Sequence, residues 1–141
     1  MTAYLVDVNL LLALSWPGHQ FHELAQTWFA RNARKGWATC PMVEAGFVRV
    51  LSNPAFSARA VSPKEALDAL KFNTKHSAHR FWADELPVVE ALANLQPRVV
   101  GHQQITDAYL LALALHHRGK LATLDKGIGA WAGGAAVEVI G

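Results

Sequence analysis

Cysteine is almost absent from this sequence, because Cys40 is the only one among 141 residues. One thiol excludes an internal disulfide and a metal cluster held by several thiolates. Such sparing use of cysteine fits a reducing compartment. We therefore expect Cys40 to be an ordinary residue of the hydrophobic core.

Long hydrophobic runs are missing as well. No stretch reaches the roughly 18 apolar residues that a membrane-spanning helix needs, and the first residues lack the regions of a signal peptide. We therefore expect a cytoplasmic protein with no membrane segment. With 52% hydrophobic residues, the chain can bury a substantial core, and its length predicts a single domain over residues 1–141.

Short apolar segments alternate with amphipathic segments along the chain. Strands are predicted at 3–8, 37–40, 80–82, 120–124 and 136–140. Helices are predicted at 10–14, 20–35, 41–51, 62–75, 87–95 and 108–115. This alternation is typical of an α/β fold, a three-layer α/β/α sandwich around a mainly parallel sheet of about five short strands.

Several helix ends carry residues that commonly cap helices. Asn9 is the expected N-cap of the first helix, and Thr106 is the expected cap of the very apolar helix near the end of the chain. Ser62 and Glu65 have the spacing of a capping box. Gly119 is expected to end the apolar helix.

Four acidic residues stand where a parallel sheet exposes functional side chains. Asp7 and Asp125 fall at the ends of predicted strands, whereas Glu44 and Asp107 lie at the starts of helices. Each has an ordinary explanation on its own, such as a capping role for Glu44 or a turn for Asp125. Because all four can face one edge of the sheet, we predict that they form one site.

Carboxylates gathered in one pocket raise each other's pKa unless divalent cations neutralise them. Hard oxygen ligands in this number select Mg²⁺ or Mn²⁺ over Zn²⁺, and one or two such ions can activate water against a phosphodiester. Setting the four acids aside leaves seven of the 11 acidic residues against 13 Lys and Arg. That balance favours a polyanionic partner. The sequence has no P-loop, nucleophile elbow, dinucleotide motif or Cys/His zinc spacing.

The sequences LVDVN around Asp7, ITDAY around Asp107 and TLDKG around Asp125, together with Glu44, resemble the acidic motifs of PIN-domain ribonucleases. Over nearly its whole length the chain also resembles the toxin half of VapBC-type toxin–antitoxin pairs. The resemblance implies cleavage of RNA by a Mg²⁺- or Mn²⁺-dependent endonuclease. It further implies a homodimer and inhibition by a small antitoxin protein.

The same resemblance assigns roles to individual residues. It makes Asp7, Glu44, Asp107 and Asp125 the metal-binding and catalytic acids, and it gives Asn9 and Thr123 supporting roles. We expect Asp7 and Asp107 to hold the metal chiefly, so that a water is oriented against the scissile phosphate.

Three alternatives stay open. A receiver-type signalling domain normally has an acid pair at its first strand, where this chain has only Asp7 between Val6 and Val8. A small phosphatase of the haloacid dehalogenase type has a second acid two residues after the first, where this chain has Asn9. A PIN-like module that binds partners without catalysis is the third.

Other polar and aromatic residues receive weaker assignments. Asp84 and Glu85 are expected to cap a helix, with a lesser prospect of joining the acidic site. The His116–His117 pair is expected to stabilise the end of its helix. Phosphate contacts are conceivable for Arg31, Arg34, Lys35, Arg49, Arg80 and Lys126. Base stacking is an alternative for Trp16, Trp28, Trp82 and Trp131, although a core or dimer role is expected for most of them.

Overall fold

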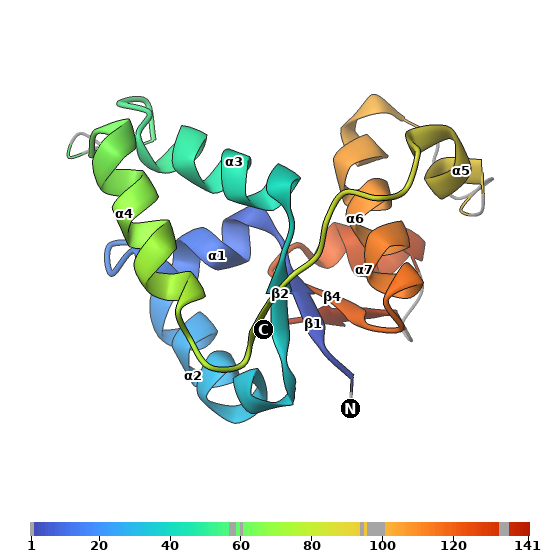
Figure 1. Ribbon diagram of the computed structural model, residues 1–141, viewed down its shortest axis with the longest axis horizontal. Coiled ribbons are helices and arrows are strands. Elements are labelled where there is room, and N and C mark those ends of the chain that lie inside the picture. Colours follow the sequence, from blue (N-terminus) through green and yellow to red (C-terminus); the bar gives the residue numbers. More distant parts are fainter. Residues whose placement is uncertain (1, 57–58, 60, 94, 96–100, 133–135) are drawn as a thin grey trace.

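A five-stranded parallel sheet lies at the centre of the molecule (Figure 1). The computed structural model describes residues 2–56, 59, 61–93, 95, 101–132 and 136–141. The strands, in the spatial order β3-β2-β1-β4-β5, are β1 (Tyr4–Val6), β2 (Trp37–Thr39), β3 (His79–Phe81), β4 (Lys120–Thr123) and β5 (Val137–Val139). All four strand pairs are parallel. β1 and β2 are fully buried, as expected where helices cover both faces of a parallel sheet.

Helices flank the sheet on both sides (Figure 1). One side carries α1 (Val8–Ser15), α2 (His22–Asn32), α3 (Pro41–Leu51) and α4 (Pro63–Thr74). The other side carries α5 (Val88–Ala93), α6 (Ile105–His116) and α7 (Lys126–Ala132). Two short 3₁₀ turns occur at Ala33–Lys35 and His102–Gln104. The predicted α/β/α sandwich is therefore confirmed. Within the described residues, no helix is both long and apolar enough to cross a bilayer.

α6 is the most deeply buried helix of the fold. Its residues from Ala108 to Ala114 are all buried, and it packs against β1 and β4. The prediction of a buried apolar helix is confirmed, except that Leu115 is 46% exposed. The hydrophobic core therefore holds α6 in place against β1 and β4.

The first helix begins two residues earlier than the sequence suggested. Asp7 is its N-cap: the backbone there is extended, and the Asp7 carboxylate accepts the Leu10 N–H. The expectation that Asn9 is the cap was wrong, because Asn9 lies inside α1. One aspartate therefore ends β1 and starts α1.

The boundaries of α6 also differ from expectation. Thr106 lies inside the helix, and the N-cap is Gln104, whose side chain does not cap the helix. The C-cap is His117, and Arg118 adopts the left-handed conformation with φ of 58°. Gly119 has a steric role instead, since a Cβ there would lie 2.6 Å from the Ala3 carbonyl oxygen.

Two further local predictions, for the start of α4 and for Cys40, are confirmed, whereas one helix was not predicted. The capping box at the start of α4 is confirmed, with both Ser62 and Glu65 making their reciprocal bonds to the backbone. Cys40 is buried as expected, and burial raises the pKa of its thiol to about 12. No helix was predicted where α7 occurs, because Gly127 and Gly129 lower helix propensity there.

Candidate active site at the carboxyl edge of the sheet

The strand order changes direction between β1 and β4. From β1 the chain builds β2 and β3 on one side, and it then returns to add β4 and β5 on the other. Open α/β sheets bind ligands at the carboxyl ends of the strands beside such a reversal. Asp7 follows β1 directly, and Asp125 lies two residues beyond the end of β4.

Asp7 is a buried carboxylate, with only 7% of its surface exposed. Its Oδ1 accepts the Leu10 N–H at 2.8 Å, and its Oδ2 accepts the Thr123 hydroxyl at 2.5 Å. Burial raises the pKa of Asp7 to about 6, against the effect of these two hydrogen bonds. The negative charges of Asp107 and Asp125 raise it further. The fold therefore holds a carboxylate whose ionised form is disfavoured.

Asp107 and Asp125 complete an electrostatically coupled group with Asp7. Asp107 lies in the first turn of α6, and its pKa is raised by burial and by the charge of Asp125. Asp125 is exposed; its Oδ1 accepts the Gly127 N–H at 2.8 Å, and its own N–H donates to Thr123 Oγ1 at 3.0 Å. These contacts support the predicted convergence of the three aspartates.

Glu44 has a different set of partners. Its Oε2 accepts the Thr39 hydroxyl at 2.6 Å, and Thr39 Oγ1 also lies 2.8 Å from His79 Nε2. Because Thr39 gives its one proton to Glu44, it must accept the proton of the His79 ring. Burial lowers the pKa of His79, while the Glu44 charge opposes that shift. Thr39 and His79 were missed by the sequence analysis, since neither belongs to a recognisable motif.

The side chains of the four acids do not all converge on one point. In the part of the chain that the structure describes, no three of them bring ligand atoms within 4.8 Å of one another. Asp107 and Asp125 act on the pKa of Asp7, whereas Glu44 is not among the groups that shift it. Three aspartates therefore gather at the β1–β4 edge, while Glu44 stands at the end of β2.

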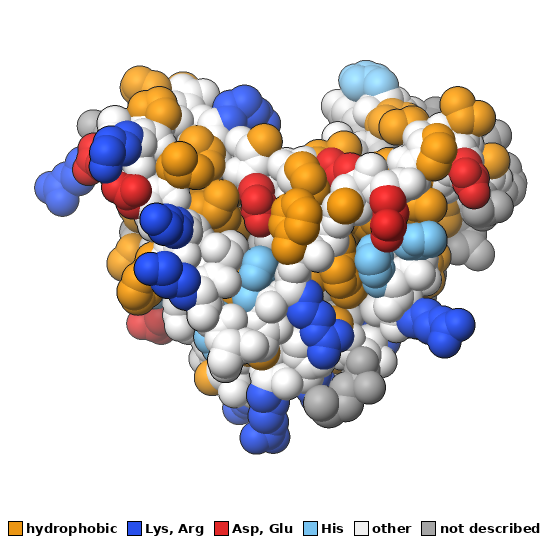
Figure 2. All heavy atoms as spheres, in the orientation of Figure 1, with side chains coloured by type: hydrophobic (Ala, Val, Ile, Leu, Met, Phe, Trp, Pro, Cys, Tyr) orange, Lys and Arg blue, Asp and Glu red, His pale blue; other side chains and the backbone are white. Residues whose placement is uncertain are grey.

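The surface between the two lobes of the molecule is hollowed, and acidic side chains lie along this hollow (Figure 2). One lobe is formed by α3 and α4, and the other by α5 and α6 (Figure 1). Among the described residues, no Lys or Arg forms an ion pair with Asp7, Glu44, Asp107 or Asp125. No cationic side chain of the described residues is therefore paired with the negative charge at this edge.

This donor set fits a hard divalent cation. Its atoms are carboxylate oxygens, and the aspartates carry negative charges that raise one another's pKa and that a cation would neutralise. Oxygen donors of this kind suit Mg²⁺ or Mn²⁺ better than the softer metals that histidine and cysteine prefer. The chemistry of the residues present therefore agrees with the metal implied by the sequence.

The two residues predicted to support the acids differ in what they contact. Thr123 bonds both Asp7 and the backbone of Asp125, so it joins two of the acids directly. Asn9 is exposed, and its Oδ1 lies 3.0 Å from His19 Nε2. The role of Asn9 stays a prediction.

The basic and aromatic candidates lie mostly away from this edge. Arg34 and Arg80 line a hollow beside Gly36, which precedes β2 and so marks the amino end of the strands. Trp28 and Trp82 are buried core residues, and Trp16 packs against Phe56. The side chain of Trp131, the fourth tryptophan considered for base stacking, lies outside the described part of the structure.

Comparison with known proteins places the chain in a family. Residues 4–133 match the family model of the PIN domain. The chain belongs to the PIN domain family, and the resemblance drawn from the acidic motifs is confirmed. Membership excludes the receiver-type and dehalogenase-type alternatives.

Two relatives from Mycobacterium tuberculosis are similar along most of their length. Ribonuclease VapC39 is 40% identical over 140 residues, which cover 99% of this chain and 100% of the relative. Ribonuclease VapC38 is 43% identical over 124 residues, covering 88% of this chain and 86% of the relative.

Solved structures share the fold at low sequence identity. The crystal structure of M. tuberculosis VapC20, a Sarcin-Ricin loop cleaving toxin, has a TM-score of 0.68 at 17% identity and covers 98% of this chain and 99% of its own. FitAcB from Neisseria gonorrhoeae has a TM-score of 0.64 at 19% identity and covers 95% of each chain. At these identities the likeness shows the architecture alone.

Proposed function

We propose that this protein is a metal-dependent endoribonuclease that acts as the toxin of a toxin–antitoxin pair. The observation that carries the proposal is Asp7, a buried carboxylate with a pKa of about 6 at the sheet reversal, beside two further aspartates. The relatives named as ribonucleases, about 40% identical to this chain, support RNA as the substrate.

In this proposal Asp7, Asp107 and Asp125 bind the metal, and Glu44 completes its shell directly or through water. A bound Mg²⁺ or Mn²⁺ lowers the pKa of a coordinated water and polarises the phosphodiester. The oxygen-only donor set favours Mg²⁺ or Mn²⁺, as one or two ions, over the softer transition metals.

The chain's own residues orient the acids. Thr123 and the Leu10 amide each hold one oxygen of Asp7, so the carboxylate plane is set before any ligand arrives. Thr39 does the same for one oxygen of Glu44. Such hydrogen bonds fix the direction of the remaining lone pairs and limit the reorganisation needed on binding.

The proposal includes an antitoxin partner and a homodimer. The likeness to VapBC-type toxins supports the antitoxin, whose C-terminal segment would cover the site. For the homodimer, the supporting observation is a set of exposed apolar side chains on the packed pair α5 and α6, namely Val88, Val89, Ile105 and Leu115. Exposed apolar side chains on adjacent helices are typical of surfaces that contact another subunit.

RNA cleavage by the purified protein tests the proposal. We expect cleavage with Mg²⁺ or Mn²⁺ and none with EDTA. Asp7→Asn and Asp107→Asn should each reduce the rate by about 100-fold or more, because each removes charge that helps hold the metal. Asp68→Asn is the matched control, since Asp68 is an exposed residue of α4 paired with Lys64.

Two results would contradict the assignment. Cleavage by Asp7→Asn at the rate of the unmodified protein would remove Asp7 from the site. A protein that binds its antitoxin but cuts no RNA with either ion would instead be the catalytically silent binding module.

A further inference from the structure

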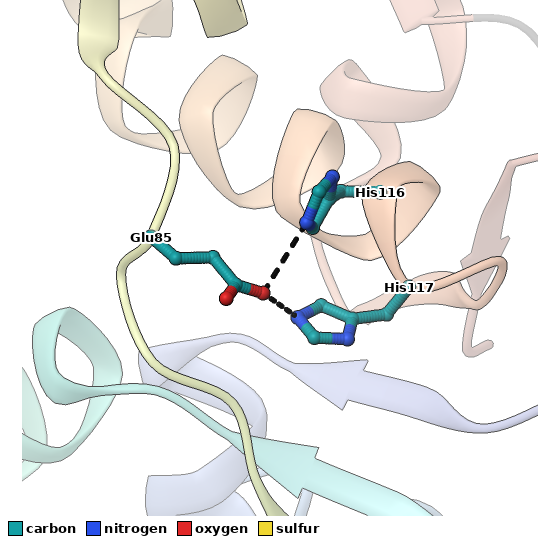
Figure 3. Close-up of side chains that lie close together, drawn as sticks. All are labelled: Glu85, His116 and His117. Carbon is teal, nitrogen blue, oxygen red and sulfur yellow. Dashed lines mark ion pairs between the residues drawn. The ribbon is translucent and has the colours of Figure 1, made fainter.

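A second group of potential ligands lies at the opposite end of α6 from Asp107. Glu85, in the segment between β3 and α5, points toward His116 and His117 at the end of α6 (Figure 3). Its Oε1 lies 3.2 Å from His116 Nε2 and 3.0 Å from His117 Nε2. In the part of the chain that the structure describes, this is the only group of three side chains whose ligand atoms lie within 4.8 Å of one another.

These contacts differ from the role expected for Glu85 and add to the role expected for the two histidines. α5 begins at Val88, so Glu85 is not adjacent to its first residue and does not cap it. The two histidines do lie at the end of α6, but both rings face the same carboxylate oxygen. The two imidazoles at the end of the helix therefore also belong to a cluster of possible metal ligands.

His117 is held in place before any ligand binds. Its ring stacks on the buried Trp82, with centroids 4.3 Å apart and planes 9° apart. The buried Nε2 of His117 faces Glu85, yet it is not aligned for a hydrogen bond and has no hydrogen-bond partner in the described structure. Burial lowers the pKa of His117 despite the opposing charge of Glu85, which favours the neutral ring that metals bind.

The spacing of the atoms fits a tetrahedral ion. Zinc bonds of about 2.0–2.1 Å to nitrogen and oxygen place neighbouring ligand atoms about 3.3 Å apart. The observed distances of 3.2 and 3.0 Å between Glu85 Oε1 and the two nitrogens are close to that value. Partial exposure of Glu85 and His116 leaves room for a water as fourth ligand.

We propose that Glu85, His116 and His117 form a second metal site, specific for Zn²⁺ or a similar borderline transition metal. Two imidazoles and one carboxylate select such ions over Mg²⁺, so this site differs in chemistry from the aspartate group. It is also separate in space, because Asp107 and His116 are nine positions apart in α6, a distance of roughly 14 Å along the helix. The ion would clamp the segment after β3 onto the end of α6.

Zinc titration calorimetry of the full-length, tag-free protein tests this site. We expect one Zn²⁺ to bind, and we expect Glu85→Gln and His116→Gln to weaken that binding at least tenfold. His102→Gln is the matched control, because His102 is exposed and lies outside the cluster. Asp7→Asn should leave the zinc site intact, which separates this proposal from the nuclease site.

Circular dichroism and thermal melting without metal show whether the Glu85→Gln and His116→Gln variants are folded. Both Glu85 and His116 are about half exposed, so their replacement should leave the circular dichroism and the melting temperature without metal unchanged. Cobalt substitution gives a second readout, since Co²⁺ held by imidazole has visible absorption bands that His116→Gln should abolish. Unchanged zinc affinity in both Glu85→Gln and His116→Gln, or loss of the ion in Asp7→Asn instead, would overturn the proposal.

Discussion

Thr123 donates its hydroxyl hydrogen to the carboxylate of Asp7 across the β1–β4 pair, with 2.5 Å between Thr123 Oγ1 and Asp7 Oδ2. The same hydroxyl oxygen accepts the N–H of Asp125 at 3.0 Å. Thr123 therefore ties together two of the acids, although it is 116 residues from one of them and two from the other.

Replacing Asp7 with Asn should stabilise the metal-free protein. A shift of the Asp7 pKa from 3.8 to about 6 corresponds to about 3 kcal/mol at neutral pH. Because Asn cannot reproduce both hydrogen bonds of the carboxylate, a gain of about 1–3 kcal/mol is expected. Urea unfolding in EDTA at pH 7.5 measures it, with Asp68→Asn as an exposed control. An equal or lower free energy of unfolding for Asp7→Asn would contradict the prediction.

The stability of the metal-free protein should also depend on pH through Asp7. Because the folded-state pKa is raised to about 6, the folded protein binds more protons than the unfolded chain between pH 3.8 and 6. Asp7 therefore makes the free energy of unfolding fall as pH rises through this window, and it has no further effect above it. The difference between wild type and Asp7→Asn, measured by urea unfolding from pH 3.5 to 7.5, isolates this contribution. A difference that does not change with pH would argue against a raised pKa.

Thr123→Val should move the pKa of Asp7 above 6. The hydroxyl of Thr123 stabilises the ionised carboxylate, so its loss favours the protonated form. Thr123→Ser keeps the hydroxyl and should leave the pKa near 6. Titration of the Asp7 carboxyl carbon by NMR, in EDTA, compares the two variants. Equal pKa values in Val and Ser variants would show that the hydrogen bond has no such effect.

Thr39→Val should weaken catalysis through Glu44 without touching the three aspartates. The variant removes the hydrogen bond that orients the Glu44 carboxylate. Loss of a residue that positions a metal ligand typically costs about 10–100-fold in metal affinity or activity. The rate of RNA cleavage as a function of Mg²⁺ concentration measures both, and Thr39→Ser should retain most of the activity. A Val variant with the Mg²⁺ dependence of wild type would leave Glu44 outside the metal shell.

Val89→Asp should disrupt the proposed dimer. Val89 is 84% exposed on α5, so the substitution should change the stability of the monomer by less than about 0.5 kcal/mol. A carboxylate in an apolar contact is strongly unfavourable, and the mass from light scattering should fall from dimer to monomer. Phe72→Asp, at an exposed apolar position of α4, is the matched control. Dissociation by Phe72→Asp alone would move the contact to the other lobe.

Much of the architecture follows from local sequence patterns. The apolar run of α6, the capping box of α4 and the strand ends at Asp7 and Asp125 are each visible within a few residues. Long uniform patterns leave few alternative structures, which explains why the sheet and its layers could be predicted. That residues 1–141 form one domain stays a prediction.

The errors arise where local options are equivalent by residue type or where distant residues decide between them. Asp7 and Asn9 are equally good N-caps by residue type. In the structure, Asp7 is the cap, because its carboxylate accepts the hydrogen bond of the Leu10 N–H. The helix α7 has two glycines, and a Cβ at Gly129 would lie 2.9 Å from Val139. Packing against β5 therefore explains a residue whose intrinsic preference argues against a helix.

The functional details that were missed are also long-range. Glu44 meets His79 through Thr39, and Glu85 meets two histidines 31 and 32 residues further along the chain. No spacing rule connects such residues before the topology is known. The sequence could therefore name the acids but not the groups that orient them.

The placement of β1 at the centre of the sheet bears on how the protein is made. β1 is synthesised before its neighbour β4, which emerges from the ribosome more than 110 residues later. Until then Asp7 has neither Thr123 nor Asp125 beside it, and pairing over such a sequence separation is slow. In the proposed nuclease, the aspartates that would bind the metal can therefore come together only after β4 has been made.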